Sequence, residues 1–431
     1  MLFKSGAALL LAAAQCVAGL TVPCKRADSD RKVFAHYMVG LTSGQSSSQW
    51  STDVSDAKSA GIDGFALNVG STDSWNDVQL PLAYAAAASA GSFSLFLSFD
   101  MAATSWTVDQ VNSLINQYKD EGAQFKVNSL PFVSTFEGPD WSDNWASVRS
   151  ATGGIFLVPD WSSLGASGVG AKASLIDGAF NWGAWPNANS KTITSDADTQ
   201  YQSALGDKAY MMGVSPYFYT DLPQYSKNWY STGDTLWYDR WTQVLDVLPE
   251  YVELITWNDY GESSYLNSPV TAQIVSGAEG YVDGFDHTAF RFVLPYFIAA
   301  YKAGTADVAL PSGEGAVAWY RTTSKSVCGD GGTVWGQGGS ASAADGTDDV
   351  ISVIALSNSP GADITVSIGG SSTSVKATST VGKASFYTTS FSGKSGAVSI
   401  TVGGKTTTGT AISASCPSSG QVNFNAVAVQ I

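Results

Sequence analysis

Short apolar runs rich in Val, Ile, Phe and Tyr recur along the first 300 residues, and helix-like stretches separate most of them. The eight runs begin near Val33, Gly64, Phe93, Ser129, Gly154, Gly178, Lys208 and Tyr251. The intervening stretches cover residues 49–60, 76–90, 108–121 and 236–248, and a final one covers 285–301. In 108–121, apolar side chains fall on one helical face. Continuously apolar strands that alternate with helices are typical of a parallel sheet covered on both faces.

Eight strand–helix units fit the size of a closed (β/α)8 TIM barrel, which we predict for residues 27–305. The fifth and sixth crossovers are the weakest part of this count because each has only about 16 residues. An open, doubly wound sheet is the alternative that the pattern leaves open.

The chain changes character after Lys302. Residues 303–315 carry Pro311 and three glycines, which is typical of a linker. Short alternating runs then follow at 349–356, 364–368, 397–402 and 422–431, separated by Gly, Ser and Pro. This spacing without a helical period predicts an antiparallel β-sandwich over residues 306–431.

The composition excludes several classes of function. Hydrophobic residues make up 44% and charged residues 14%, so a large core can form. The formal net charge of -15 makes nucleic acid an improbable partner. Only two histidines occur, which rules out a three-histidine zinc site, and we expect neither metal nor organic cofactor.

The first 26 residues resemble a targeting segment. Lys4 precedes a short apolar stretch that ends in small residues, and the dibasic pair Lys25-Arg26 follows, although two ordinary surface bases would look the same. With no later stretch of membrane-spanning length, we expect a secreted monomer, outside the cell or in the cell wall. Cleavage would leave two cysteines, Cys328 and Cys416, which we expect to pair in an oxidising compartment.

Polar and aromatic residues collect at the predicted strand ends, where a (β/α)8 barrel forms its active site. The candidates for substrate contact are His36, Asn68, Asp100, Glu137, Asp160, Trp182, Tyr217, Trp257, Tyr260 and His287. Carboxylates can bond sugar hydroxyls or move protons, and aromatic rings stack on the apolar faces of pyranoses. Any one tryptophan could instead fill space between the strands and the helices.

The sharpest feature is the segment from Trp257 to Glu262. Asp259 and Glu262 stand three residues apart around Gly261, at the end of the eighth strand. Glycoside hydrolysis usually takes two carboxyl groups on opposite sides of the scissile bond. The alternative on chemistry alone is one catalytic carboxylate and one hydrogen-bond anchor.

Three segments together resemble glycoside hydrolase family 71, the fungal α-1,3-glucanases or mutanases. They are Phe34-Ala35-His36-Tyr37-Met38-Val39-Gly40, Gly61-Ile62-Asp63-Gly64-Phe65-Ala66-Leu67-Asn68 and Trp257-Asn258-Asp259-Tyr260-Gly261-Glu262-Ser263. The resemblance covers about 33–302. It implies an inverting, endo-acting hydrolase of α-1,3-glucan on a (β/α)8 barrel, with Asp259 and Glu262 as the catalytic pair.

For the mechanism we expect Glu262 to be the acid and Asp259 the base, because the longer glutamate side chain suits the leaving-group side. Two other functions stay open: hydrolysis of another glucan linkage, and non-catalytic polysaccharide binding on the same fold. The role of the C-terminal part is also left open.

Overall fold

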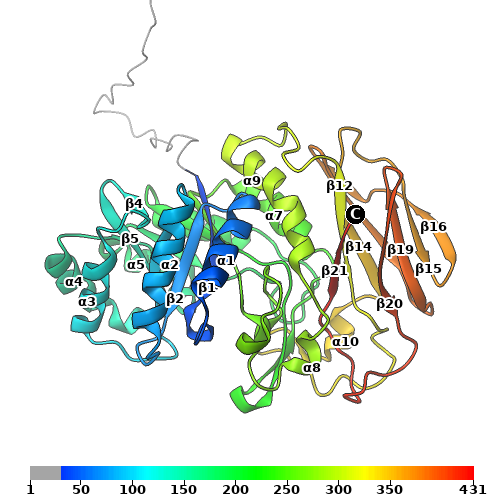
Figure 1. The fold of residues 1–431 in the computed structure, drawn as a ribbon, viewed down its shortest axis with the longest axis horizontal. Coiled ribbons are helices and arrows are strands. Elements are labelled where there is room, and N and C mark those ends of the chain that lie inside the picture. Colours follow the sequence, from blue (N-terminus) through cyan, green and yellow to red (C-terminus); the bar gives the residue numbers. More distant parts are fainter. Residues whose placement is uncertain (1–30) are drawn as a thin grey trace, which may run out of the picture.

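The computed structural model describes residues 31–431. The predicted signal peptide and dibasic site therefore lie outside the described residues. Figure 1 shows a curled sheet with helices on its outer side, followed by two further sheets at the C-terminal end of the molecule. Within 31–431, no helix combines the length and the apolar character that a membrane crossing requires.

Eight parallel strands form the curled sheet in chain order. They are β1 (Lys32–Met38), β2 (Gly64–Val69), β3 (Ser94–Asp100), β5 (Leu130–Phe136), β6 (Phe156–Leu157), β7 (Gly178–Asn181), β8 (Ala209–Val214) and β11 (Tyr251–Leu254). Pairing runs β5-β3-β2-β1-β11-β8-β7, so the first strand lies beside the last. The short strand β6 pairs with β5, and the two-residue β4 (Lys126–Val127) adds antiparallel to the same strand. Single bridges then join Asp160 to Phe136 and to Phe180.

Helices follow the strands and cover the outer side of the sheet (Figure 1). They are α1 (Ser47–Ser59), α2 (Asn76–Ala90), α3 (Val108–Tyr118), α4 (Trp145–Thr152), α5 (Gly165–Ala171), α6 (Asp196–Leu205), α7 (Leu236–Val247) and α9 (Leu294–Ala303). Capping boxes begin α1, at Ser46 with Gln49, and α3, at Thr107 with Gln110. The predicted final helix, 285–301, is a 3-10 segment (Thr288–Val293) that continues into α9.

A hairpin absent from the prediction, β9 (Tyr219–Leu222) with β10 (Lys227–Tyr230), follows β8.

The sheet is filled from within by aromatic rings. Phe34 lies 4.9 Å from Phe96 and 6.3 Å from Tyr251, measured between ring centroids. Phe132 joins them at 5.3 Å from Tyr251. These residues alternate along their strands with side chains that face the helices, so each strand is buried on both faces, as a helix-covered parallel sheet requires.

Two antiparallel sheets follow residue 315. One has the order β17-β18-β14-β12-β21 and the other β16-β15-β19-β20. Their strands are β12 (Gly315–Tyr320), β14 (Val350–Leu356), β15 (Ile364–Ile368), β16 (Ser371–Val375), β17 (Ser379–Val381), β18 (Ala384–Ser390), β19 (Gly396–Val402), β20 (Lys405–Ile412) and β21 (Val427–Gln430). Of the predicted strand 422–431, only Val427–Gln430 forms a strand, and residues 422–426 belong to no helix or strand.

The central strands β12 and β14 of the five-stranded sheet are buried on both faces. Along β12, Ala316 and Ala318 pack against the four-stranded sheet, while Val317 and Trp319 join the core beneath the helices. Strand β14 divides in the same way, with Ile351 and Val353 on one side and Ile354 on the other. The sheet is therefore the middle of three layers, and the C-terminal part is not a separate appendage.

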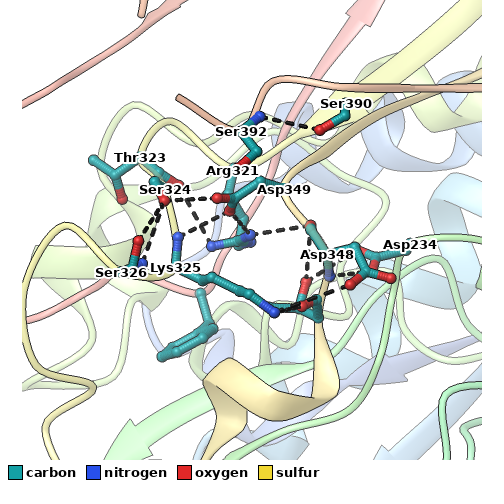
Figure 2. Close-up of polar contacts among 12 residues, drawn as sticks. Asp234, Arg321, Thr323, Ser324, Lys325, Ser326, Asp348, Asp349, Ser390 and Ser392 are labelled. Carbon is teal, nitrogen blue, oxygen red and sulfur yellow. Dashed lines mark hydrogen bonds and ion pairs between the residues drawn. The ribbon is translucent and has the colours of Figure 1, made fainter. Parts of the chain in front are cut away.

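A polar cluster ties the loop before α7 to the C-terminal sheets (Figure 2). Asp234 accepts hydrogen bonds from the backbone nitrogen of Asp348, at 2.8 Å, and from the Thr347 hydroxyl, at 3.1 Å. Next to it, the buried guanidinium of Arg321 donates to Asp349 Oδ1 at 2.7 Å. Burial raises the pKa of Asp234, and these hydrogen bonds and the Arg321 charge offset part of that cost.

The predicted disulfide between Cys328 and Cys416 is confirmed, with Cα atoms 5.6 Å apart. It joins a loop near the start of the C-terminal sheets to the segment just before β21, across 88 residues of sequence.

Replacing both Cys328 and Cys416 with Ser should lower the free energy of unfolding by about 2–4 kcal/mol, because the unfolded chain regains the entropy of an open loop. Chemical denaturation of the variant and the wild type checks this. An unchanged midpoint and slope would mean that packing alone holds the segment.

Candidate active site

The inward face of the curled sheet changes from apolar to polar toward the carboxyl ends of the strands. Two residues beyond the inward-facing apolar side chains (Phe34, Ala66, Phe96, Phe132 and Tyr251), the same strands carry buried polar side chains. These are His36, Asn68, Ser98, Ser134 and Glu253, each almost inaccessible to solvent. Because parallel strands bring their carboxyl ends to one edge, these groups form one polar layer beneath the rim.

Within this layer, the His36 imidazole Nδ1 lies 2.6 Å from Glu253 Oε1. Burial raises the pKa of Glu253, and the contact with His36 offsets part of the rise. The ring of Trp182 stands edge-on to His36 at 4.9 Å and is itself partly exposed. An indole therefore covers the buried pair and presents a face at the rim.

Asp160 lies close to this pair and is fully buried. Burial raises its pKa to about 8, hydrogen bonds from Ser162 oppose the rise, and the charges of Glu137 and Glu253 add to it. Asp160 is consequently protonated at neutral pH. The sequence-predicted site residues His36, Asp160 and Trp182 are thus brought together in this layer, with Glu253 as an additional member.

The segment after β11 is held by hydrogen bonds at three successive residues, the first two of which bond to β1. The backbone nitrogen of Trp257 donates to His36 O at 2.8 Å. The Asn258 side chain accepts from Met38 N at 2.8 Å and donates to Met38 O at 3.2 Å. The backbone nitrogen of Asp259 donates to the Thr256 hydroxyl at 2.8 Å. These bonds hold the following turn rigidly at the carboxyl edge of the sheet.

That turn is a 3-10 helix, Tyr260–Glu262, capped by Asp259. Asp259 Oδ1 accepts a hydrogen bond from the backbone nitrogen of Glu262 at 3.1 Å. Burial raises the pKa of Asp259 to about 7, and the negative charge of Glu262 adds to the rise. The Lys227 charge and the backbone hydrogen bonds oppose it. The two carboxylates therefore interact strongly while their backbone is fixed.

Lys227 supplies the positive charge at this turn. Its Nζ lies 2.6 Å from Glu262 Oε1, and the Glu262 side chain is only 14% exposed. Burial alone would lower the pKa of Lys227, but Glu262, Asp259 and Asp100 together raise it. Lys227 begins β10, so the hairpin that the sequence did not predict brings the cation to the carboxylates.

Asp100 and Glu137 lie at the same edge and organise their loops. Asp100 Oδ1 accepts from the backbone nitrogens of Ala102 and Ala103, at 3.0 and 2.8 Å. Glu137 Oε1 accepts from Ser163 N at 2.9 Å, and its other oxygen accepts from the Ser163 hydroxyl. Both side chains are only partly buried, so both remain accessible at the edge.

Four predicted substrate contacts lie elsewhere, buried in packing. Trp257 lies against Phe65, at 5.3 Å, and beneath the Arg291 guanidinium. The Tyr260 hydroxyl donates to Ser268 O at 3.1 Å, within the core. Neither ring can stack on a sugar in this arrangement.

The other two predicted contacts, Tyr217 and His287, bond to residues 424–426 near the end of the chain. The Tyr217 hydroxyl donates to Phe424 O at 2.9 Å, and His287 Nε2 donates to Ala426 O at the same distance. Burial lowers the pKa of His287 to about 4, so it is neutral. Sequence reasoning could not anticipate these contacts, since the partner residues lie more than 130 positions away.

Sequence reasoning missed Lys227 and Glu253. Glu253 left a signal: it is the one charged residue of an otherwise apolar strand and shares a face with Tyr251. Lys227 left none, because its role depends on a hairpin that brings it to Glu262, 35 positions later in the sequence.

The residues 31–431 contain no group of three or more His, Cys, Asp or Glu side chains positioned to hold a metal ion. What the edge does offer is two neighbouring carboxylates beside a cation, further carboxylates and an accessible indole. A helix-covered parallel sheet with this set at its carboxyl edge is typical of glycoside hydrolases.

The chain belongs to glycosyl hydrolase family 71, whose sequence profile matches residues 29–431. The match extends well beyond the 33–302 range of the resemblance and includes the C-terminal sheets. A glucan endo-1,3-alpha-glucosidase of Schizosaccharomyces pombe is 41% identical over 316 residues, 70% of this chain and 72% of its own. A mutanase of Penicillium rubens is 34% identical over 373 residues, 84% of this chain and 81% of its own.

Among solved structures, a family GH99 endo-alpha-mannosidase from Bacteroides thetaiotaomicron superposes with a TM-score of 0.52. The superposition covers 65% of this chain and 99% of that one at 9% identity. At this identity the likeness concerns the fold: a mixed α/β architecture with a curled sheet.

Replacing Lys227 with Met should lower turnover roughly 10- to 100-fold, because an uncompensated carboxylate pair is left in a partly buried site. Loss of the cation should also raise the pKa of Asp259 further, which moves the alkaline limb of the pH–rate profile upward.

Steady-state kinetics between pH 4 and 9 tests this against Lys126→Met, a matched variant that removes an exposed ion pair with Asp120. A Lys227→Met profile that falls in height without moving along the pH axis would show that Lys227 acts only on structure.

Proposed function

We propose that the protein is a secreted, endo-acting hydrolase of α-1,3-glucan that cleaves with inversion through Asp259 and Glu262. The observation that carries this proposal is the hydrogen-bonded turn from Asp259 to Glu262, with its two neighbouring carboxylates beside Lys227. Family membership supports the reaction type. The Schizosaccharomyces and Penicillium relatives support the α-1,3 linkage and a polysaccharide substrate.

The fold that we propose for residues 27–305 is a closed (β/α)8 barrel, followed by a β-sandwich over 306–431. Support for closure comes from the weakest junction, between β6 and β7. There, Asp177 N donates to Leu157 O and Phe180 N to Pro159 O, each at 2.9 Å. Asp160 bridges both neighbouring strands. These bonds continue the ladder where the regular strands are short.

Secretion is supported by the predicted targeting segment and by the disulfide, which persists in oxidising compartments. We also propose a monomer. The large apolar side chains exposed within 31–431 are Val78 and Tyr225, too few to form an obligate apolar interface.

The mechanism is a single displacement that needs no cofactor. One carboxylic acid protonates the glycosidic oxygen while the other carboxylate activates a water on the opposite face of the sugar. The group that keeps its proton longer is the acid. Burial and the adjacent charge of Glu262 make Asp259 that group, whereas Lys227 keeps a cation directly on Glu262. We therefore assign Asp259 as acid and Glu262 as base, the reverse of the sequence-based expectation.

His36, Glu253 and Trp182 form the floor and one wall of the site in this proposal. Asp100 and Glu137 are placed to bond sugar hydroxyls from the rim, and Asn68 and Asp160 support the buried layer. Glu253 acts as a positioning residue, because it contacts the imidazole of His36.

The linkage is tested by reducing-sugar release from insoluble α-1,3-glucan beside α-1,4- and β-1,3-glucans. Wild type should release sugar from the α-1,3 polymer alone. Asp259→Asn and Glu262→Gln should each lose about 10³-fold or more, because each lacks one proton-transfer group. Release from another polymer would overturn the linkage, and co-sedimentation without any release would make the protein a polysaccharide-binding protein.

The acid–base assignment is tested by chemical rescue. A substrate with a good leaving group needs no protonation, so Asp259→Asn should regain activity on an α-glucosyl fluoride but not on the polymer. Azide should replace the water in Glu262→Gln. The reciprocal pattern would return the acid role to Glu262.

The pH profile gives an independent readout of the same assignment. Because the pKa of Asp259 is raised to about 7, Asp259 is protonated below that pH and wild-type activity should fall as the pH rises through it. This alkaline limb should be absent for glucosyl fluoride hydrolysis by Asp259→Asn.

A further inference from the structure

A pocket of about 520 Å³ opens beside the proposed catalytic turn. One wall is the hairpin strand β10, with Lys227, Asn228 and Trp229. The other wall comes from the C-terminal part of the chain, with Val334, Gln337 and Gly338. Lys227 links the pocket to the proposed catalytic turn, because its Nζ contacts Glu262 while its side chain lines the pocket. Lys227 therefore lies between the pocket and the proposed catalytic turn.

Trp229 lies on the catalytic side of the hairpin. Side chains two residues apart on a strand share a face, so Trp229 lies on the face of Lys227. Asn228 and Tyr230 lie on the opposite face, where they contact Gly331 O and the Thr347 hydroxyl. The indole of Trp229 is partly exposed and stacks on Phe218 at 5.6 Å, with 9° between the ring planes.

A row of rings leads from Trp229 back to the polar layer. Phe218 contacts Trp185 at 4.9 Å, and Trp185 lies 6.4 Å from Trp182. Trp182 in turn stands over His36. The three indoles of this row are partly exposed, whereas Phe218 is buried beneath them. A row of accessible indoles suits a chain of pyranose rings, whose apolar faces stack on aromatic side chains.

The C-terminal wall of the pocket is preformed. Strand β13 (Val334–Trp335) pairs parallel with β10, and Gly336 N donates to Tyr230 O at 2.8 Å. The Trp335 indole donates to the Thr232 hydroxyl at 2.9 Å. Gly336 has a positive φ of 80°, and a side chain there would collide with Ala188. The following residue, Gln337, is exposed at the pocket, where its amide can reach a ligand.

We propose that this pocket is a distal glucan-binding subsite, in which Trp229 stacks on a glucose ring and Gln337 bonds its hydroxyls. This inference rests on the proposed function and extends it, because it gives the C-terminal part of the chain a direct role in holding substrate. The substrate then runs from the carboxylate pair along the indoles to the 334–339 loop, which favours long chains over short ones.

The test is kcat/KM on a series of α-1,3-linked gluco-oligosaccharides of increasing length. For wild type, kcat/KM should rise with length until the pocket is filled. In Trp229→Ala the deficit should grow along the series, from small on the shortest cleaved substrate to roughly tenfold on the longest, since burial of one ring face is lost. Gln337→Ala should change the profile in the same direction by less, and Trp229→Tyr should restore part of the loss.

The matched control is Tyr225→Ala, which removes the exposed ring at the tip of the same hairpin, outside the pocket lining. It should follow the wild-type profile. Gln337 is on an exposed loop, so its variant keeps the test valid if Trp229→Ala does not fold.

Two outcomes overturn the proposal separately. If wild type cleaves the series but Trp229→Ala and Gln337→Ala lose activity equally at every length, or lose none, the subsite is wrong and the proposed function stands. If wild type cleaves none of the α-1,3 series, the proposed function fails and the subsite fails with it.

Discussion

The contact between Lys227 and Glu262 is the interaction on which the site depends. Two carboxylates at one 3-10 turn, in a chain of net charge -15, repel each other and resist ionising together. The Lys227 cation, 2.6 Å from Glu262, removes part of this electrostatic cost. It also gives the two carboxylates different electrostatic surroundings. Burial and the neighbouring Glu262 charge raise the pKa of Asp259, whereas Glu262 has the Lys227 cation directly beside it. A single-displacement hydrolase requires such a difference in surroundings between its acid and its base, the roles that we propose for Asp259 and Glu262.

Placing that cation involves the whole chain. Lys227 stands on a hairpin, which β13 extends into a three-stranded sheet of order β13-β10-β9. The segment that carries β13 is in turn held by the disulfide and by the Asp234–Asp348 contacts. The five-stranded sheet beyond it shares one core with α7 and α9. This packing agrees with the family profile, which spans both parts of the chain, and it makes the C-terminal sheets a structural support of the proposed catalytic turn.

Local patterns predicted the eight parallel strands, helices α1, α2, α3, α7 and α9 and the disulfide, because period and cysteine count are readable within short windows. They missed the short helices α4, α5 and α6 and the C-terminal strands β12, β16, β17, β18 and β20. The parallel order of the strands also places His36, Asp160 and Trp182 close together. Long-range packing was not readable. Trp257, Tyr260, Tyr217 and His287 have the chemistry of sugar contacts, yet helices and the returning segment 422–426 bury them. Lys227 was missed for the same reason: nothing near it in sequence indicates its partner.

The most direct test of the account is the anomeric configuration of the first product, followed by proton NMR while the wild-type enzyme cleaves an α-1,3-linked gluco-oligosaccharide. A pair that acts through a water on the opposite face of the sugar must release the β-anomer, which then mutarotates to the equilibrium mixture. Initial appearance of the β-anomer is the result that the account predicts. Initial appearance of the α-anomer would mean a covalent intermediate, and would contradict the roles of Asp259 as acid and Glu262 as base.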